Sequence, residues 1–179
     1  MIYLLTGISG VGKSTVIHNC DAEFVHINFG DIVLEIAKEE GLAENRDDLK
    51  TISAEKTKQI QEKVVERLKQ MDGKVLLDTH LTIESPYGFF PGIPYWMAKE
   101  LQFKSIILIE APIEEIQKRR NKDTGIRKRE ENTLEEIRTQ RDMDRSAAVT
   151  LSVMAGPNVK IIENVDLEKA SNELKELLE

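Results

Sequence analysis

The 179-residue sequence contains one cysteine, Cys20, and no apolar run near the ~20 residues that a membrane-spanning helix needs. A single cysteine excludes an intramolecular disulfide framework and a zinc site built from cysteines, including a four-ligand zinc lid. The N-terminus lacks the basic start and long apolar core of a signal peptide. These absences predict a protein of the reducing cytoplasm, with no membrane segment and no zinc.

Positive charge is also scarce, because 25 Lys and Arg residues face 32 Asp and Glu residues and leave a net charge of −7. This balance argues against general nucleic-acid binding, which needs spread positive charge. The basic residues that are present gather instead in one short segment and predict a focused anion site. They are Lys118, Arg119, Arg120, Lys122, Arg127, Lys128 and Arg129.

The most specific motif is a phosphate-binding loop of the form G-x-x-x-x-G-K-[ST], placed directly between a predicted strand and a predicted helix. In such a loop the backbone N–H groups surround a polyphosphate. Lys13 would reach the β- and γ-phosphates, and the Ser14 hydroxyl would bind Mg²⁺. The motif predicts nucleoside triphosphate binding by Gly7, Ile8, Ser9, Gly10, Val11, Gly12, Lys13, Ser14 and Thr15.

Nearly continuous apolar runs alternate with amphipathic stretches along the chain. Strands are predicted at 2–5, 24–29, 75–77, 106–109 and 159–162. Helices are predicted at 13–19, 30–41, 53–71, 95–101, 113–122, 133–155 and 166–178. The alternation predicts a single α/β domain over 1–179, with a doubly wound, five-stranded parallel sheet flanked by helices. Residues of about 30–72 would form a helical arm, and about 119–132 a short lid.

Ligands of such sheets bind beyond the carboxyl ends of the strands, so the loops there carry the candidate residues. Asp78 follows the third strand and either holds a Mg²⁺-bound water or the Ser14 hydroxyl, or caps the next loop. His80 either binds a second nucleotide or hydrogen-bonds to backbone. Arg46 is a further anion-binding candidate, although Asp47 and Asp48 offer it a surface ion pair instead.

Two further segments have both a functional and a structural interpretation. Residues 85–94 hold three prolines and three aromatic rings, which suits a stiff loop that stacks on a base or one that covers the core. Several arginines in 119–145 could converge on a transferred phosphoryl group. Alternatively they form helical ion pairs with Glu135, Asp142 and Asp144. Residues 162–166 could contact a base through backbone groups.

Read together, these segments resemble archaeal-type adenylate kinases over nearly the whole chain. The shared features are the phosphate loop, Asn28-Phe29-Gly30, Arg46-Asp47, Asp78-Thr79-His80, the Pro86–Pro94 segment, Arg119-Arg120, residues 144–148 and residues 159–162. The resemblance implies the reaction MgATP + AMP ⇌ 2 ADP and a homo-oligomer, commonly a trimer. It implies AMP contacts from Asn28, Phe29, Gly30, Arg46, His80 and Tyr87. Catalytic roles are expected for Lys13, Arg46, Asp78, Arg120, Arg127 and Arg138.

The chain departs from the widespread bacterial adenylate kinases, which have Gly-x-Pro-Arg where this sequence has Thr79-His80. The arginine that clamps the AMP phosphate must therefore come from elsewhere, and Arg46 is the main candidate. Residues 121–126 are one residue longer than the archaeal type leads us to expect. The alternative functions are a kinase of GMP or UMP, and a regulatory ATPase that nucleotide binding switches.

Overall fold

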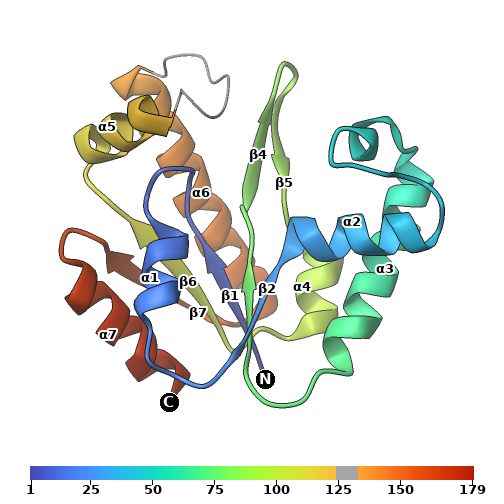
Figure 1. The fold of residues 1–179 in the computed structure, drawn as a ribbon, viewed down its shortest axis with the longest axis horizontal. Helices are drawn as coiled ribbons and strands as arrows, with labels where there is room; N and C mark the ends of the chain where they lie inside the picture. The colour runs from blue at the N-terminus through green and yellow to red at the C-terminus, as the bar shows by residue number, and fades with distance from the viewer. Residues whose placement is uncertain (124–132) are drawn as a thin grey trace.

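A central sheet of five parallel strands organises the molecule, with the strand order β2-β3-β1-β6-β7. The structure is a computed structural model and describes residues 1–123 and 133–179. The strands are β1 Ile2–Thr6, β2 Val25–Asn28, β3 Val75–Asp78, β6 Ser105–Glu110 and β7 Asn158–Glu163. The helices are α1 Lys13–Asn19, α2 Phe29–Glu39, α3 Ala54–Lys69, α4 Tyr95–Leu101, α5 Ile113–Asp123, α6 Leu134–Ala155 and α7 Leu167–Leu178. Helices cover both faces of the sheet (Figure 1), as the sequence predicts.

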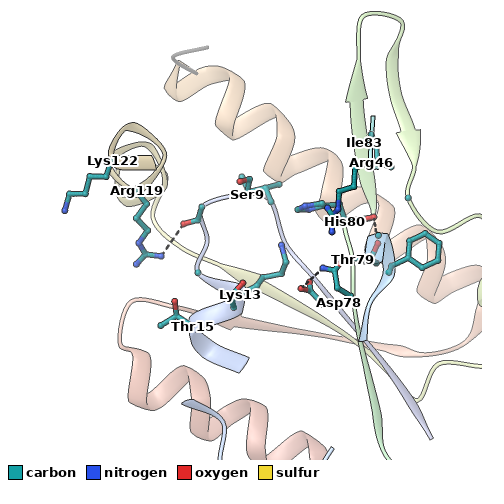
Figure 2. A pocket seen from close by; sticks show the side chains of 18 residues that line it. Ser9, Lys13, Thr15, Arg46, Asp78, Thr79, His80, Ile83, Arg119 and Lys122 are labelled. Carbon is teal, nitrogen blue, oxygen red and sulfur yellow. Dashed lines mark hydrogen bonds between the residues drawn. The ribbon is translucent and has the colours of Figure 1, made fainter. Parts of the chain in front are cut away.

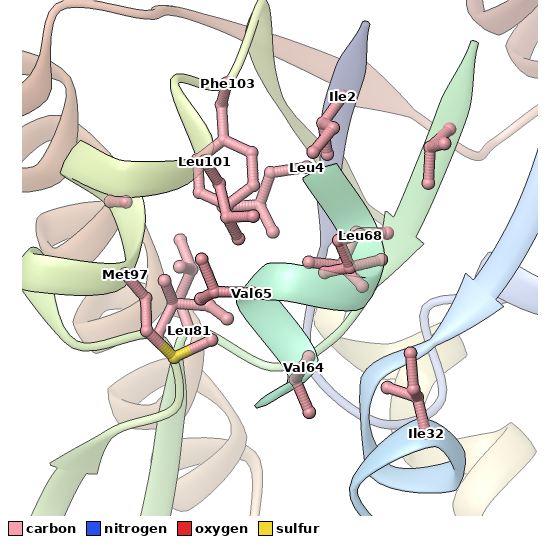
Figure 3. Packing of buried hydrophobic residues seen from close by; sticks show 14 of the residues in the cluster. Ile2, Leu4, Ile32, Val64, Val65, Leu68, Leu81, Met97, Leu101 and Phe103 are labelled. Atoms are coloured by element: carbon pink, nitrogen blue, oxygen red, sulfur yellow. The ribbon is translucent and has the colours of Figure 1, made fainter. Parts of the chain in front are cut away.

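The apolar strands face two separate cores, which explains why their sequences are almost continuously hydrophobic. Leu4 and Leu77 point into one cluster with α2, α3, α4 and α6, part of which Figure 3 shows. Leu5 and Leu76 point into the other cluster, with α1, α5 and α7. Because successive strand residues alternate between the faces, both cores are built from the same short strands.

The predicted helix ends also agree with the structure. Thr133 and Glu136 form a reciprocal capping box at the start of α6, and Gly156 ends that helix in a left-handed conformation with φ of 96°. Asp166 caps α7 by accepting a hydrogen bond from the Lys169 amide. These caps define where α6 begins and ends and where α7 begins.

The segment predicted as a stiff loop is instead an antiparallel hairpin of β4 Thr82–Ser85 and β5 Gly88–Pro91. Ser85 closes its turn, because its hydroxyl donates to the Gly88 carbonyl and accepts from the Tyr87 amide. Pro91 lies opposite Thr82 at the foot, where a two-stranded ribbon tolerates the missing N–H. In Figure 1 the hairpin stands up from the carboxyl edge of the sheet.

The predicted arm contains α2, the short 3-10 helix η1 Asp48–Thr51 and α3. Val64 and Leu68 of α3 are fully buried in the first core. Arg67 of α3 pairs with Glu35 and Glu39 of α2. The second half of α3 therefore anchors the arm to the sheet, and η1 with its flanking turns extends furthest from it (Figure 1).

Candidate active site

A cleft of about 700 Å³ lies at the carboxyl ends of β1, β2 and β3, where the sequence places the ligand site. The phosphate loop forms one wall, and the start of α2 with Arg46 forms the opposite wall (Figure 2). The loop after β3, the hairpin and α5 complete the lining. The lining residues are Ile8, Ser9, Gly10, Gly12, Lys13, Ser14, Thr15, Asn28, Phe29, Gly30, Arg46, Asp78, Thr79, His80, Ile83, Gly92, Arg119 and Lys122.

The path of the phosphate loop depends on glycine at two crowded positions. Gly7 has a φ of 141°, and a Cβ there would lie 2.4 Å from the Ile109 carbonyl oxygen. Gly12 has a φ of 92°, and a Cβ there would lie 2.4 Å from the Asn164 amide nitrogen. Only glycine adopts these conformations without a side-chain clash. The glycine spacing in the sequence thus sets the shape of the loop.

Lys13 extends back across the loop, where its ammonium donates to the Gly7 carbonyl at 2.6 Å. Desolvation within the loop lowers the pKa of Lys13, while the carboxylates of Asp78 and Asp144 act in the opposite direction. A partly desolvated ammonium at this point gains more from a bound phosphate than one in open water. The geometry therefore suits a phosphate-binding lysine.

Three side chains hold the loop from outside through its carbonyl groups. Arg119 donates to the Val11 carbonyl at 2.9 Å, and Asn164 donates to the same oxygen at 2.8 Å. Arg120 donates from Nε to the Ser9 carbonyl at 2.8 Å. Asn164 thus contacts the loop through its side chain, whereas the sequence suggested a backbone contact to a base.

The interpretation of Arg120 as a cleft-facing catalytic arginine is not supported. Its side chain is buried, with 5% exposure, and it does not line the cleft because it is directed at the loop backbone. Its neighbour Arg119 lines the cleft instead, as Figure 2 shows. Adjacent residues on α5 point in different directions, and sequence alone does not tell which one faces the ligand.

Asp78 is the strongest candidate for a metal-linked carboxylate. It is 6% exposed, and its Oδ1 has no hydrogen-bond partner among the described residues. The other oxygen, Oδ2, accepts from the Asn28 amide at 3.5 Å and lies 3.7 Å from His26 Nε2. A buried carboxylate oxygen without a partner is costly unless a ligand satisfies it. Asp78 and Ser14 line the same cleft, so this donor set fits a hydrated Mg²⁺.

His80 lines the cleft and also makes the backbone contact that the sequence analysis left open. Its Nδ1 lies 3.1 Å from the Gly7 carbonyl oxygen, which can only accept, so Nδ1 carries the proton. Desolvation, followed by the Lys13 charge, lowers the pKa of His80. A neutral His80 therefore links the loop after β3 to the start of the phosphate loop.

Asn28, Phe29, Gly30 and Arg46 line the wall opposite the phosphate loop. Arg46 donates to Asp31 on α2 at 2.5 Å, and both side chains are exposed. The predicted surface ion pair thus exists, but with Asp31 rather than with Asp47 or Asp48. An exposed pair of this kind is weak, so the guanidinium remains available to an anion in the cleft.

Several predicted residues do not meet in the cleft. Tyr87 is 92% exposed at the turn of the hairpin, because the segment folds as a ribbon that carries its tip into solvent. The hairpin contributes Ile83 instead, and Gly92 follows it. Arg138 is exposed on α6 and does not line the cleft. Arg127, and with it most of the predicted lid, lies outside the described residues.

Other α6 residues follow the structural interpretation only in part, because among the described arginines of this helix only Arg141 pairs with one of the predicted acidic partners. Arg145 forms a bidentate ion pair with Glu110 at the end of β6, and Arg141 pairs with Asp142. Asp144 is 1% exposed and, instead of pairing with an arginine, accepts from Thr82 at the foot of the hairpin. Ile83 and Gly92 were not singled out from the sequence as cleft residues, because the hairpin that brings them there was not predicted.

The sheet order, the glycine-rich loop and the lysine within it define a phosphate-loop nucleotide-binding protein. The family model described as an AAA domain matches residues 6–138, which is more than half of the chain. Shikimate kinase from Acinetobacter baumannii superposes with a TM-score of 0.58 at 18% identity, covering 98% of this chain and 90% of that one. This likeness shows that the two chains share a fold.

Sequence relatives define the family more closely. The adenylate kinase of Methanopyrus kandleri is 42% identical over 98% of this chain and 96% of its own length. The adenylate kinase of Methanothermobacter thermautotrophicus is 38% identical over 99% of both chains. The chain therefore belongs to the adenylate kinase family, in agreement with the resemblance seen in its motifs.

Proposed function

We propose that the protein transfers the γ-phosphoryl group of MgATP to AMP and yields two ADP. The observation that carries this proposal is a cleft with two opposed walls. The phosphate loop forms one wall, and Asn28, Phe29, Gly30 and Arg46 form the other. A phosphate loop alone supports binding of one nucleotide. A second wall with its own cation supports a phosphate acceptor that lies end to end with the donor.

The phosphate loop is the proposed MgATP site, with Lys13 on the β- and γ-phosphates. Ser14 and Asp78 would hold Mg²⁺, Asp78 partly through water, since its buried Oδ1 has room for one more donor. When bound, the metal neutralises charge on the phosphate oxygens. Among the described residues no three His, Cys, Asp or Glu side chains gather as they would in an all-protein metal site. This agrees with a cation that arrives with its nucleotide.

The acceptor would lie along α2, with its phosphate taking the place of Asp31 at the Arg46 guanidinium. Planar, bidentate recognition of phosphate favours arginine for this role. AMP contacts from Asn28, Phe29, Gly30 and His80 fit the cleft wall that they line. The exposed position of Tyr87 gives its assignment no support. Contacts from Arg127 and Arg138 on the transferred phosphoryl group remain predictions.

Phosphoryl transfer to AMP needs positioning rather than a general base, because the acceptor is already a phosphate oxygen anion. Two segments would close over the cleft, the arm from α2 to α3 and the lid predicted at about 119–132. Closure would exclude water and suppress wasteful hydrolysis of ATP. This role of the two segments is part of the proposal.

A panel of monophosphates tests the assignment. With saturating MgATP, ADP release is measured in the presence of AMP, GMP or UMP, and we expect AMP to give the highest kcat/KM. A preference for GMP or UMP would move the assignment to another monophosphate kinase. ATP turnover that no monophosphate stimulates would contradict the kinase assignment and favour a nucleotide-switched regulator. A bisubstrate analogue with two adenosines should occupy both walls of the cleft.

We also infer that the protein assembles with copies of itself, as its family resemblance implies, and that it acts in the cytoplasm, as its single cysteine indicates. An apolar face supports self-association. It consists of Phe90 on the hairpin, Tyr95 at the start of α4, and Met143 and Met154 on α6, all exposed. A groove of about 450 Å³ runs between the hairpin and α6 within this apolar face. Its proposed occupant is a second copy of the chain.

No described helix is long and apolar enough to cross a membrane.

A further inference from the structure

A chain of hydrogen bonds connects the hairpin to the phosphate loop through α6. The side-chain oxygen of Gln140 accepts from Arg120 Nη2 at 2.9 Å, and its amide nitrogen donates to the Glu84 carboxylate on β4. Arg120 in turn donates to the Ser9 carbonyl. The guanidinium can only donate and the carboxylate can only accept, so the orientation of the Gln140 amide is determined. Gln140 is thus the central member of the chain.

The burial of Arg120 and Gln140 makes this chain of hydrogen bonds important for the phosphate loop. Arg120 is 5% exposed, so its charge depends on the polar groups that surround it. Gln140 itself is half-buried. Together with Ser9, Glu84 and His80 it lines a side cavity of about 210 Å³ next to the cleft. A change at Gln140 therefore acts on a buried cation that touches the phosphate loop, without removing any group that lines the cleft.

A second connection runs parallel to the first. Asp144, one helical turn after Gln140 on α6, accepts from the amide and the hydroxyl of Thr82. Thr6 immediately precedes the phosphate loop, and its hydroxyl donates to the Asp144 carboxylate at 3.3 Å. One face of α6 thus ties β4 to the phosphate loop at two points. Contacts of α6 with both β4 and α5 accompany this arrangement.

We propose that Gln140 is a positioning residue for MgATP binding. It holds the Arg120 guanidinium on the Ser9 carbonyl, and Glu84 holds Gln140. This inference rests on the proposed assignment of the phosphate loop to MgATP. The AMP wall is built from other elements, so the effect of Gln140 is confined to the triphosphate. A KM change for one substrate and not for the other separates positioning from a general loss of structure.

The test is steady-state kinetics of the full chain with both substrates varied. Gln140→Ala should raise KM for MgATP ~5-fold, because only part of the free energy of the lost hydrogen bond to Arg120 reaches the phosphate loop. KM for AMP should stay close to wild type, and the Tm should fall by only ~2–4 °C, because Arg120 keeps its hydrogen bond to Ser9. Glu84→Gln is the matched control, because its amide oxygen still accepts from Gln140, and it should change KM for MgATP less than twofold.

Exchanging the amide and the carboxylate between positions 140 and 84 provides a rescue experiment. Gln140→Glu places two carboxylates side by side and should also raise KM for MgATP. Adding Glu84→Gln to it restores a donor, because the new amide at position 84 then donates to a carboxylate that still accepts from Arg120. KM should therefore return toward wild type in the double variant. Unchanged KM for MgATP in Gln140→Ala, an equal rise for both substrates, or a swap without rescue would each overturn the proposal.

Titration with MgATP alone keeps this inference separate from the proposed function. If no monophosphate stimulates turnover of the wild type, the kinase assignment fails. The dissociation constant for MgATP would still decide the role of Gln140. We then expect the same ~5-fold weakening in Gln140→Ala, whereas an equal dissociation constant would contradict it.

Discussion

At the scale of single residues, Lys13 and Asp78 carry the clearest expectations, because each is a charged group held partly out of water beside the phosphate loop. One is a cation that a phosphate would satisfy, and the other is an anion that a hydrated cation would satisfy. Their charges already interact, since Asp78 opposes the lowering of the pKa of Lys13. Removing either should affect turnover far more than folding.

Lys13→Met should lower kcat by ~1,000-fold or more, because a desolvated cation that stabilises the transferred phosphoryl charge is lost. The Tm should change little, because His80 still donates to the Gly7 carbonyl that loses the Lys13 ammonium. The measurement is coupled ADP formation with MgATP and AMP. Lys169→Met, at an exposed lysine on α7, is the control and should keep wild-type turnover. Near-native phosphotransfer by Lys13→Met would show that the assigned chemistry is wrong.

Asp78→Asn should separate stability from activity. The neutral amide removes a buried carboxylate oxygen that lacks a partner among the described residues, so the Tm should equal or exceed that of wild type. Turnover should fall ~100-fold and need more Mg²⁺ for saturation, because the group that holds the hydrated cation is neutral. Calorimetry and a Mg²⁺ titration of activity, with EDTA as the zero point, measure both effects. A lower Tm with unchanged activity would assign Asp78 a structural role only.

How much the sequence predicts at this scale depends on where a side chain's partner lies. The phosphate loop follows from its own glycine spacing, and Asp78 follows from its place at the end of a buried strand. The sequence offers Arg46 its neighbours Asp47 and Asp48, but its partner Asp31 lies 15 residues earlier and meets it only through the fold of the arm. Arg119 and Arg120 have the same chemistry, and only the direction of each side chain from α5 distinguishes them.

At the scale of elements, the strands of the sheet and the helices around it were predictable because their hydrophobic periods extend over many residues. Glycines or capping residues also mark their ends. The hairpin was not predictable, since its eight paired residues include Pro91 and Gly88, which are typical of loops. Its pairing is local and two-stranded, so no buried apolar run indicates it. The missed hairpin also explains why Tyr87 lies at an exposed turn and does not line the cleft.

Gly92→Ala tests how closely the hairpin returns to the sheet. A Cβ at position 92 would lie 1.8 Å from the His80 carbonyl oxygen, a backbone atom that cannot move aside alone. We expect a loss of about 2 kcal/mol or more in the free energy of unfolding. Gly41→Ala, which has open space around it but a φ of 66°, should cost only about 1 kcal/mol. Equal losses in urea denaturation would contradict the close approach.

At the scale of the whole molecule, the proposed oligomer can be tested by measuring its molecular mass in solution. Met154 on α6 is 52% exposed within the apolar face. Met154→Glu should convert the proposed oligomer into monomers in light scattering after size exclusion, because a charge cannot be buried there without a partner. Val165→Glu is the control, since Val165 is 70% exposed but leads into α7, which packs against the other core. A monomeric wild type, or a Met154→Glu oligomer of unchanged mass, would rule out this interface.

The carbonyl of Gly7 accepts from both Lys13 and His80. When the Lys13 ammonium moves to a bound triphosphate, the His80 imidazole still donates to the Gly7 carbonyl. No polar atom then loses all of its hydrogen bonds. The protein can thus keep its ammonium within reach of the donor and release it at small energetic cost. This arrangement favours rapid binding of the donor nucleotide, without a slow rearrangement of the site after the nucleotide arrives.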